Sequence, residues 1–225
     1  MPCLVGYVVV SQSRIKLNIL VGGQLEESNN LFEHLSELLR KGIDPADHEM
    51  GIWEKYGEER CVLVIDTVGF TRISSEQGIV YFLSKLVLIR EAIIPVIEGN
   101  GGEGVRPYAD NVYAMFNNPR DALKSAIEAN QELKKRKLML TPKEPCQISC
   151  GIGFGRLLYS SKYDGYFGNE MNLAFKLGED IAAGGEILIS QNSFNGLSKK
   201  FQKLFEKRST SISGTVIPYF RLFCQ

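Results

Sequence analysis

The sequence predicts an α+β protein with the ferredoxin-like split βαβ arrangement, in which an antiparallel-rich sheet is flanked by helices. Short continuous apolar runs, such as residues 61–66 and 186–190, have the length and composition of covered strands. A longer segment, residues 75–95, has apolar side chains at helical spacing. From residue 61 the predicted order is β-α-β-β-α-β-α-β-β-β, which is the split βαβ order. The 225 residues are 44% hydrophobic and 23% charged, as in an ordinary globular protein.

Residues 1–59 are predicted to form an N-terminal extension, and residues 60–225 a second domain. Two strands are expected in the extension, at residues 4–10 and 15–21. A helix capped by Ser28 follows, because apolar side chains then recur at the helical period up to Gly42. The extension carries no chemical motif; a small sensor, a dimerisation arm and a packed extension are all open interpretations.

The second domain begins with the strand at residues 61–66, which ends in a Thr-Val-Gly-Phe-Thr turn. A long helix is expected from about Ser75, and Pro95 should bend or end it. The remaining elements expected, in chain order, are a hairpin of residues 105–108 and 112–116, a helix over residues 119–137 capped by Asn118, a strand over 147–155, a helix over 169–182, a strand over 186–190, and two strands near 204–209 and 216–223.

Charge balance and cysteine content limit the classes of function. The 26 lysines and arginines equal the 26 aspartates and glutamates, so bulk charge disfavours a nucleic-acid partner. No segment approaches the roughly 18 consecutive apolar residues of a membrane span, and the first residues lack the order of a secretion signal. Five cysteines, sparse and odd in number, fit a reducing compartment, so we expect a cytoplasmic protein without structural zinc.

Two carboxylates lie at the ends of predicted strands. Asp66 ends the apolar strand, and Asp110 lies at the tip of the predicted hairpin. A split βαβ sheet can bring both to one edge, where two hard oxygen ligands suit Mg²⁺ or Mn²⁺ together with substrate phosphates. The turn of residues 67–71 leads into a helix start, whose backbone N–H groups suit a triphosphate. The alternative is structural: Asp66 caps the following turn and Asp110 is an ordinary hairpin residue.

Five segments in order resemble the class III nucleotidyl cyclase domain of adenylate and guanylate cyclases. They are VLVIDTVGFT, YADNVYAMF, GIGFG, YFGNEMNLAFKL and GGEILIS. Asp66 and Asp110 are 44 residues apart, which is close to the family's separation of its two metal aspartates. The resemblance covers residues 60–225.

The resemblance implies a set of site residues. Asp66, Asp110 and the Thr67 carbonyl would hold two Mg²⁺ or Mn²⁺ ions per site. Asn172 matches the family's transition-state Asn, and Lys176 occupies the position of its Arg, on the same helix face. Lysine keeps the charge but lacks the bidentate fork of arginine. The turn residues expected beside the phosphates are Val68, Gly69, Phe70 and Thr71.

The residues implied in base recognition depart from the family pattern. Arg106 stands where the family has a purine-selecting Lys. Gly165 stands where it has a purine-selecting Asp, and Asp164 lies one place earlier. Ser213 occupies the position of a phosphate-binding Lys.

The resemblance therefore implies a homodimer that converts a nucleoside triphosphate to a 3′,5′-cyclic nucleotide and pyrophosphate for intracellular signalling. ATP is expected as the substrate ahead of GTP, and a pyrimidine nucleoside triphosphate is a further alternative. The metal aspartates would come from one subunit and the Asn172 helix from the other. The alternative is a catalytically weak or inactive cyclase-like module that binds a nucleotide or a partner as a regulator.

Overall fold

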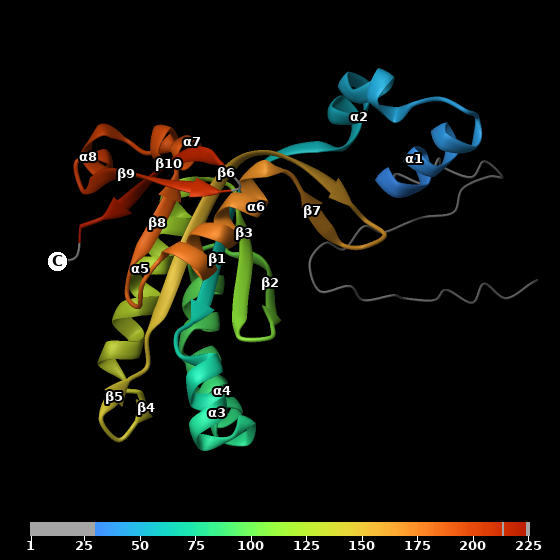
Figure 1. Cartoon of the computed structure of the whole chain (residues 1–225). Helices are drawn as coiled ribbons and strands as arrows, with labels where there is room; N and C mark the ends of the chain where they lie inside the picture. Colours follow the sequence, from blue (N-terminus) through green and yellow to red (C-terminus); the bar gives the residue numbers. More distant parts are fainter. Residues whose placement is uncertain (1–29, 213, 224–225) are drawn as a thin grey trace, which may run out of the picture.

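The computed structural model of the chain describes residues 30–212 and 214–223 (Figure 1). The strands predicted at residues 4–10 and 15–21, and Ser213, lie outside the described residues. The described elements, in chain order, are α1 (Leu31–Arg40), η1 (Pro45–His48), α2 (Glu49–Tyr56), β1 (Gly57–Thr67), α3 (Phe70–Gln77), α4 (Ile79–Gly99), β2 (Glu103–Tyr108), β3 (Asn111–Phe116), α5 (Pro119–Lys135), β4 (Met139–Thr141), β5 (Glu144–Pro145), β6 (Ile148–Ser160), β7 (Gly165–Phe167), α6 (Asn169–Phe175), η2 (Lys176–Ile181), β8 (Ile187–Ser190), α7 (Gln191–Gly196), α8 (Lys199–Gln202), β9 (Phe205–Ile212) and β10 (Thr215–Leu222).

The main sheet has the strand order β2-β3-β1-β6-β8-β10-β9, with β7 paired to β6. β1 lies between β3 and β6 and runs antiparallel to both. β6 and β8 run parallel, and α6 and η2 form the connection between them. The sheet is mixed but largely antiparallel and is flanked by helices, so the predicted α+β class is confirmed.

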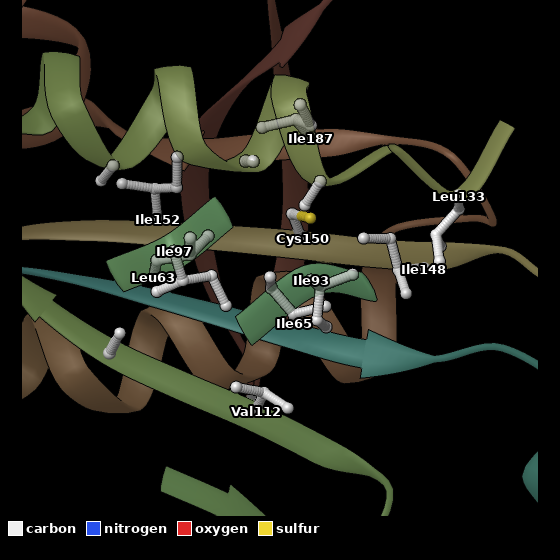
Figure 2. Close-up of a cluster of buried hydrophobic side chains, with 14 of the residues drawn as sticks. Leu63, Ile65, Ile93, Ile97, Val112, Leu133, Ile148, Cys150, Ile152 and Ile187 are labelled. Carbon is white, nitrogen blue, oxygen red and sulfur yellow. The ribbon is translucent and has the colours of Figure 1, made fainter. Parts of the chain in front are cut away.

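Alternate side chains of β1 enter two different cores, as strand geometry requires. Cys61, Leu63 and Ile65 face the larger core, which α4 and α5 cover. Figure 2 shows Leu63 and Ile65 beside Ile93 and Ile97 of α4. All of these side chains are at most 1% exposed, so this core fixes the position of the central strand.

The opposite face of β1 carries Val62 and Val64, which pack with Ala174 of α6. Gly151 and Gly153 of β6 are the reason that this helix lies so close to the sheet. A Cβ atom at Gly151 would overlap the Ala174 carbonyl oxygen, and one at Gly153 would overlap that of Glu170. The glycine-rich end of β6 is therefore a packing surface for the helix that carries Asn172.

Several element boundaries differ from the sequence prediction. The first described helix is capped by Asn30, whose side chain accepts from the Phe32 N–H, instead of by Ser28. The turn expected after β1 leads into a helix as predicted, but the helix begins at Phe70 instead of about Ser75 and is divided at Gly78 into α3 and α4. α4 continues through Pro95 to Gly99, so the proline does not end it. Burial of apolar side chains on both sides of Pro95 offsets the backbone hydrogen bond that proline removes.

The helix predicted over residues 169–182 is divided into α6 and the π-helical η2. Single π-helical turns of this kind often mark functional positions. The sequence reading also missed short elements, namely β4, β5, β7, α7 and α8. Elements of two to six residues are too short to show a hydrophobic period.

The described part of the predicted extension contains α1, η1 and α2, which lie to one side of the sheet in Figure 1. Leu31, Ile52 and Tyr56 form a small separate core. The Phe32 ring packs edge-on against Tyr163, at 4.7 Å between centroids, and against Phe167 beyond the β6–β7 turn. β1 begins at Gly57, and the division of the chain near residue 60 stays a prediction. None of the described helices combines the length and apolarity needed to cross a bilayer.

Candidate active site

Strand register places Asp66 at the open end of β1. Asp66 continues the alternation of Val62 and Val64, so its side chain lies on the α6 and η2 face of the sheet. It lies opposite Asn111 of β3 and Ser149 of β6 in the pairing register. Asp110 directly precedes Asn111, so the sheet brings both predicted metal aspartates to one edge. We call Asp66, Asp110 and the nearby Glu179 the carboxylate edge.

The charges at this edge repel one another. Burial, and after it the charges of Asp110 and Glu179, together raise the pKa of the Asp66 carboxyl from 3.8 to about 6. Hydrogen bonds from the Thr67 N–H and the Ser149 hydroxyl oppose the rise. The Glu179 pKa is also raised, first by burial and then by the charges of Asp180 and Asp110. Part of this negative charge is therefore uncompensated by the protein.

The β2–β3 turn that carries Asp110 is tightly held. Tyr108 pairs with Asn111, which leaves Ala109 and Asp110 as the two turn residues. Ala109 has φ +49°, in the left-handed region that a residue with a Cβ atom rarely adopts. The Arg90 guanidinium of α4 donates to the Ala109 carbonyl. The Asn111 side-chain amide donates to Glu179 Oε1.

The turn after β1 places Thr67, Val68 and Gly69 in front of α3. Gly69 has φ +97°, and a Cβ atom there would lie 3.0 Å from Leu140 Cδ2, so glycine is required. The Val68 N–H already donates to the Gln147 carbonyl at 3.1 Å, so it is not oriented toward a phosphate. The Phe70 ring packs edge-on against Phe82, which ties the start of α3 to the core.

Helical capping rules leave the first backbone N–H groups of α3 without intrahelical partners. Phe70 and Thr71 are the first two residues of that helix, and the Thr71 side chain is exposed. The structure therefore favours the N–H groups from Phe70 onward over that of Val68 as ligands for a phosphate.

Asn172 and Lys176 lie one helical turn apart, and both side chains are exposed. Asn172 belongs to α6, and Lys176 begins the π-helical η2. Lys176 Nζ forms an ion pair with Asp180 Oδ2 at 2.9 Å. This pairing raises the pKa of Lys176, so the side chain stays charged at neutral pH. In the single chain, η2 therefore brings Glu179 to the carboxylate edge, while Lys176 is engaged with Asp180.

Arg106 and Asp164, which the sequence separates by 58 residues, form an ion pair. The Tyr159 hydroxyl donates to the other carboxylate oxygen of Asp164 at 3.0 Å. Asp164 adopts φ +45° in the turn between β6 and β7. These three residues line a pocket of about 60 Å³, which we call the Arg106 pocket. Its other lining residues are Arg60, Glu103, Gly104, Tyr113, Met115, Gly165 and Tyr166.

The structure thus groups the predicted site residues into two places and adds new ones. Sequence reasoning missed Glu179, Asn111, Arg90 and Tyr159. Tyr159 hydrogen-bonds Asp164, Arg90 and Glu179 interact electrostatically with Asp110, and Asn111 directly follows it. Burial raises the pKa of the Cys150 thiol on β6 to about 12, so this thiol stays protonated at neutral pH and is a poor nucleophile.

The donor set at the carboxylate edge fits a hard divalent cation. Two carboxylates lie at this edge with excess negative charge, and carboxylate oxygens are ligands that a hard divalent cation prefers. Within the described residues, no group of three or more His, Cys, Asp or Glu side chains converges as a complete metal site. A cation there would need further ligands, which water supplies in the nucleotide-free protein and the phosphates supply when a nucleotide is bound.

Comparison with solved structures identifies the fold. An adenylate/guanylate cyclase/hydrolase from Silicibacter pomeroyi superposes with a TM-score of 0.65 at 23% identity, covering 75% of this chain and 98% of that one. The adenylyl cyclase CyaB from P. aeruginosa gives a TM-score of 0.58 at 20% identity, over 75% of this chain and 95% of that one. A dimeric guanylyl cyclase domain from Blastocladiella emersonii gives 0.60 at 15% identity, over 74% and 97%.

No protein-family model matches the sequence, and no curated protein matches it. The chain therefore has the fold of adenylate and guanylate cyclase catalytic domains, in agreement with the motif resemblance, at a level of identity that establishes the fold alone.

Proposed function

We propose that the chain is a nucleotidyl cyclase, which converts a nucleoside triphosphate to a 3′,5′-cyclic nucleotide and pyrophosphate. The observation that carries this proposal is the proximity of Asp66 and Asp110, whose neighbour Asn111 pairs with Asp66 at the end of β1, on a sheet of the cyclase fold. A fold keeps two repelling carboxylates together only at a cost, and a cation bound between them removes that cost.

Mg²⁺ or Mn²⁺ would be held by Asp66, Asp110 and the Thr67 carbonyl, two ions per site. Metal ions bound there supply Lewis-acid polarisation of the phosphates and ease deprotonation of the ribose 3′-OH. The first N–H groups of α3 lie next to these ligands in the chain and would receive the phosphate oxygens.

The protein residues would orient an intramolecular displacement. The 3′-oxygen loses its proton and forms a bond to the α-phosphorus, while the bond from that phosphorus to the bridging oxygen breaks and pyrophosphate leaves. Asn172 would orient the ribose, and Lys176 would stabilise the negative charge on the transferring phosphoryl group. Lys176 must then exchange its Asp180 partner for the phosphate.

The two halves of this machinery would meet across a homodimer interface. Each subunit would supply Asp66 and Asp110 to one site and Asn172 and Lys176 to the other. A two-fold axis produces two equivalent sites in this way.

The Arg106 pocket would hold the base. Arg106 supplies donors and Asp164 an acceptor, which together suit the edge of an adenine and leave ATP as the favoured substrate. The same pair suits other bases, so substrate choice is a direct question for experiment.

The decisive experiment is an incubation of the purified protein with ATP, GTP, CTP and UTP, each with Mn²⁺. Cyclic product is separated by chromatography and identified by mass. We expect a cyclic nucleotide from at least one triphosphate and none from Asp66→Ala. If a folded, dimeric protein releases no cyclic product from any of the four, the proposal is wrong.

One observation favours a second function, a cyclase-like regulator that binds a nucleotide without turning it over. Both basic residues expected at the nucleotide, Arg106 and Lys176, are engaged in ion pairs within the chain. Calorimetry that detects nucleotide binding in the absence of product would support this alternative, whereas product formation excludes it.

A further inference from the structure

We propose that Glu179 and Asn111 act as a clamp that positions Asp110 for metal binding. The clamp deepens the proposed function, because it rests on Asp110 being a metal ligand. Neither Glu179 nor Asn111 touches the nucleotide in this proposal. Both are positioning residues.

The clamp begins with a buried amide at the start of β3. Asn111 is 8% exposed and lies opposite Asp66 in the β1–β3 register. Its Nδ2 atom donates to Glu179 Oε1, which joins the β2–β3 hairpin to η2. The hydrogen bond therefore ties Asn111, the residue after Asp110, to the π-helical segment.

The turn needs such support because it is strained. A non-glycine residue in the left-handed region is strained, and such conformations persist only where surrounding contacts over-determine them. Ala109 is in that region, and the Arg90 guanidinium holds its carbonyl oxygen. Arg90 therefore holds the residue before Asp110, and Glu179 holds the residue after it.

Repulsion between the carboxylates makes the clamp consequential for metal binding. Without cation, the charges of Asp66 and Asp110 push the hairpin tip away from β1. The Asn111–Glu179 hydrogen bond opposes that movement and pre-organises the two ligands. Partners behind a metal ligand that orient it in this way typically change metal affinity by 10–100-fold when they are removed.

Equilibrium binding of Mn²⁺ to the nucleotide-free full chain tests the clamp, with free Mn²⁺ measured by electron paramagnetic resonance. We expect Glu179→Ala and Asn111→Ala each to weaken binding by about tenfold. The double variant should be no weaker than either single one, because both remove the same hydrogen bond. Glu179→Gln keeps an acceptor for Asn111 and should retain most of the affinity.

Asp180→Ala is the matched control, because it removes one negative charge next to Glu179 without touching Asn111. We expect it to change Mn²⁺ affinity by less than about twofold. If Asp180→Ala or Glu179→Gln weakens binding as much as Glu179→Ala, or if Asn111→Ala leaves it unchanged, charge or direct ligation explains the effect and the clamp is wrong.

A further variant separates this proposal from the proposed function. Asp110→Asn should reduce Mn²⁺ affinity more strongly than any clamp variant. If Asp110→Asn binds Mn²⁺ like the unaltered protein, the metal site itself is wrong. If Asp110→Asn loses binding while the clamp variants keep it, only the clamp is wrong. Thermal unfolding of each variant establishes that the compared proteins are folded.

Discussion

The carboxylate edge and the Arg106 pocket are held together by opposite physical means. Sheet register keeps Asp66 beside Asp110 although their charges repel. Mutual attraction keeps Arg106 beside Asp164, although no strand pairing joins their segments. A repulsive pair persists only because the fold enforces it, so it supports the proposed cation site. In an attractive pair the two opposite charges compensate each other, so the pair gives much less evidence for a bound ligand.

The largest effect is expected at the repulsive pair. Asp66→Asn keeps the shape of the side chain but removes the charge that would bind a cation. We expect cyclase turnover to fall by about 10³-fold, since metal ligation supplies several kcal/mol of transition-state stabilisation. Product formation with Mn²⁺ measures the loss.

Arg106→Ala is the control for this comparison, because it alters the other region. It should leave Mn²⁺ binding within about twofold of the unaltered protein, as expected for a charge outside the ligand set. A similar loss of Mn²⁺ binding in both variants would contradict the division into two independent regions.

The second prediction concerns the packing that positions the Asn172 helix. Gly151→Ala places a methyl group on the Ala174 carbonyl, so the helix must move away from the sheet. We expect the free energy of unfolding to fall by about 1–3 kcal/mol, the usual range for overpacking. Urea denaturation measures it. Gly99→Ala is the control, because a Cβ atom there meets open space, and it should cause no loss.

These two regions also differ in how far the sequence predicted them. Asp66 and Asp110 follow from local signals, namely a strand end and a hairpin tip, and the sheet then brings them together. Arg106 and Asp164 were each assigned by resemblance, but their ion pair depends on a left-handed turn residue that no local pattern indicates. Glu179 was missed because its partner, Asn111, lies in another element 68 residues away.

The fold shows the same division between local and distant information. The period of apolar residues predicted the long helices and the central strand. It did not predict the close approach of α6 to Gly151, because that depends on backbone atoms of two elements distant in the sequence. Nor did it predict the π-helical turn after Phe175, since the apolar spacing there is equally consistent with an α-helix.

The third prediction concerns the pH dependence of stability that Asp66 of the carboxylate edge should cause. The folded-state pKa of Asp66, about 6, lies above the ordinary value of 3.8, so the folded protein binds this proton more tightly. The stability contribution is fully present below about pH 4 and is lost as the pH rises through 6. After allowance for solvent screening, we expect about 1–2 kcal/mol.

Urea unfolding in EDTA at pH 5 and pH 7 measures this contribution. The unaltered protein should lose more stability between these values than Asp66→Asn does. Added Mn²⁺ should reduce the difference at pH 7, because the cation replaces the proton in compensating the charge. An equal pH response in the two proteins would contradict the repulsive interpretation of the edge.

The fourth prediction concerns the attractive pair. Arg106→Ala leaves Asp164 without its cation and opens the pocket. We expect the ratio of kcat/KM values between the preferred base and its competitors to change by about fivefold, which corresponds to the net contribution of about 1 kcal/mol from one hydrogen bond. Stability should change by less than about 1 kcal/mol, because the Arg106 and Asp164 side chains are 34% and 52% exposed. Arg106→Lys, which restores the charge, should recover part of the selectivity.

The smallest expected effect tests whether the backbone at the tip of the β2–β3 hairpin is strained. Ala109→Gly relieves the left-handed conformation of residue 109 while keeping the carbonyl that accepts from Arg90. We expect a gain of about 0.5–1 kcal/mol in the free energy of unfolding, because the relief of strain exceeds the added backbone entropy of the unfolded chain. Ala122→Gly, within α5, is the control and should destabilise the protein. A loss of stability in Ala109→Gly would mean that the turn is not strained.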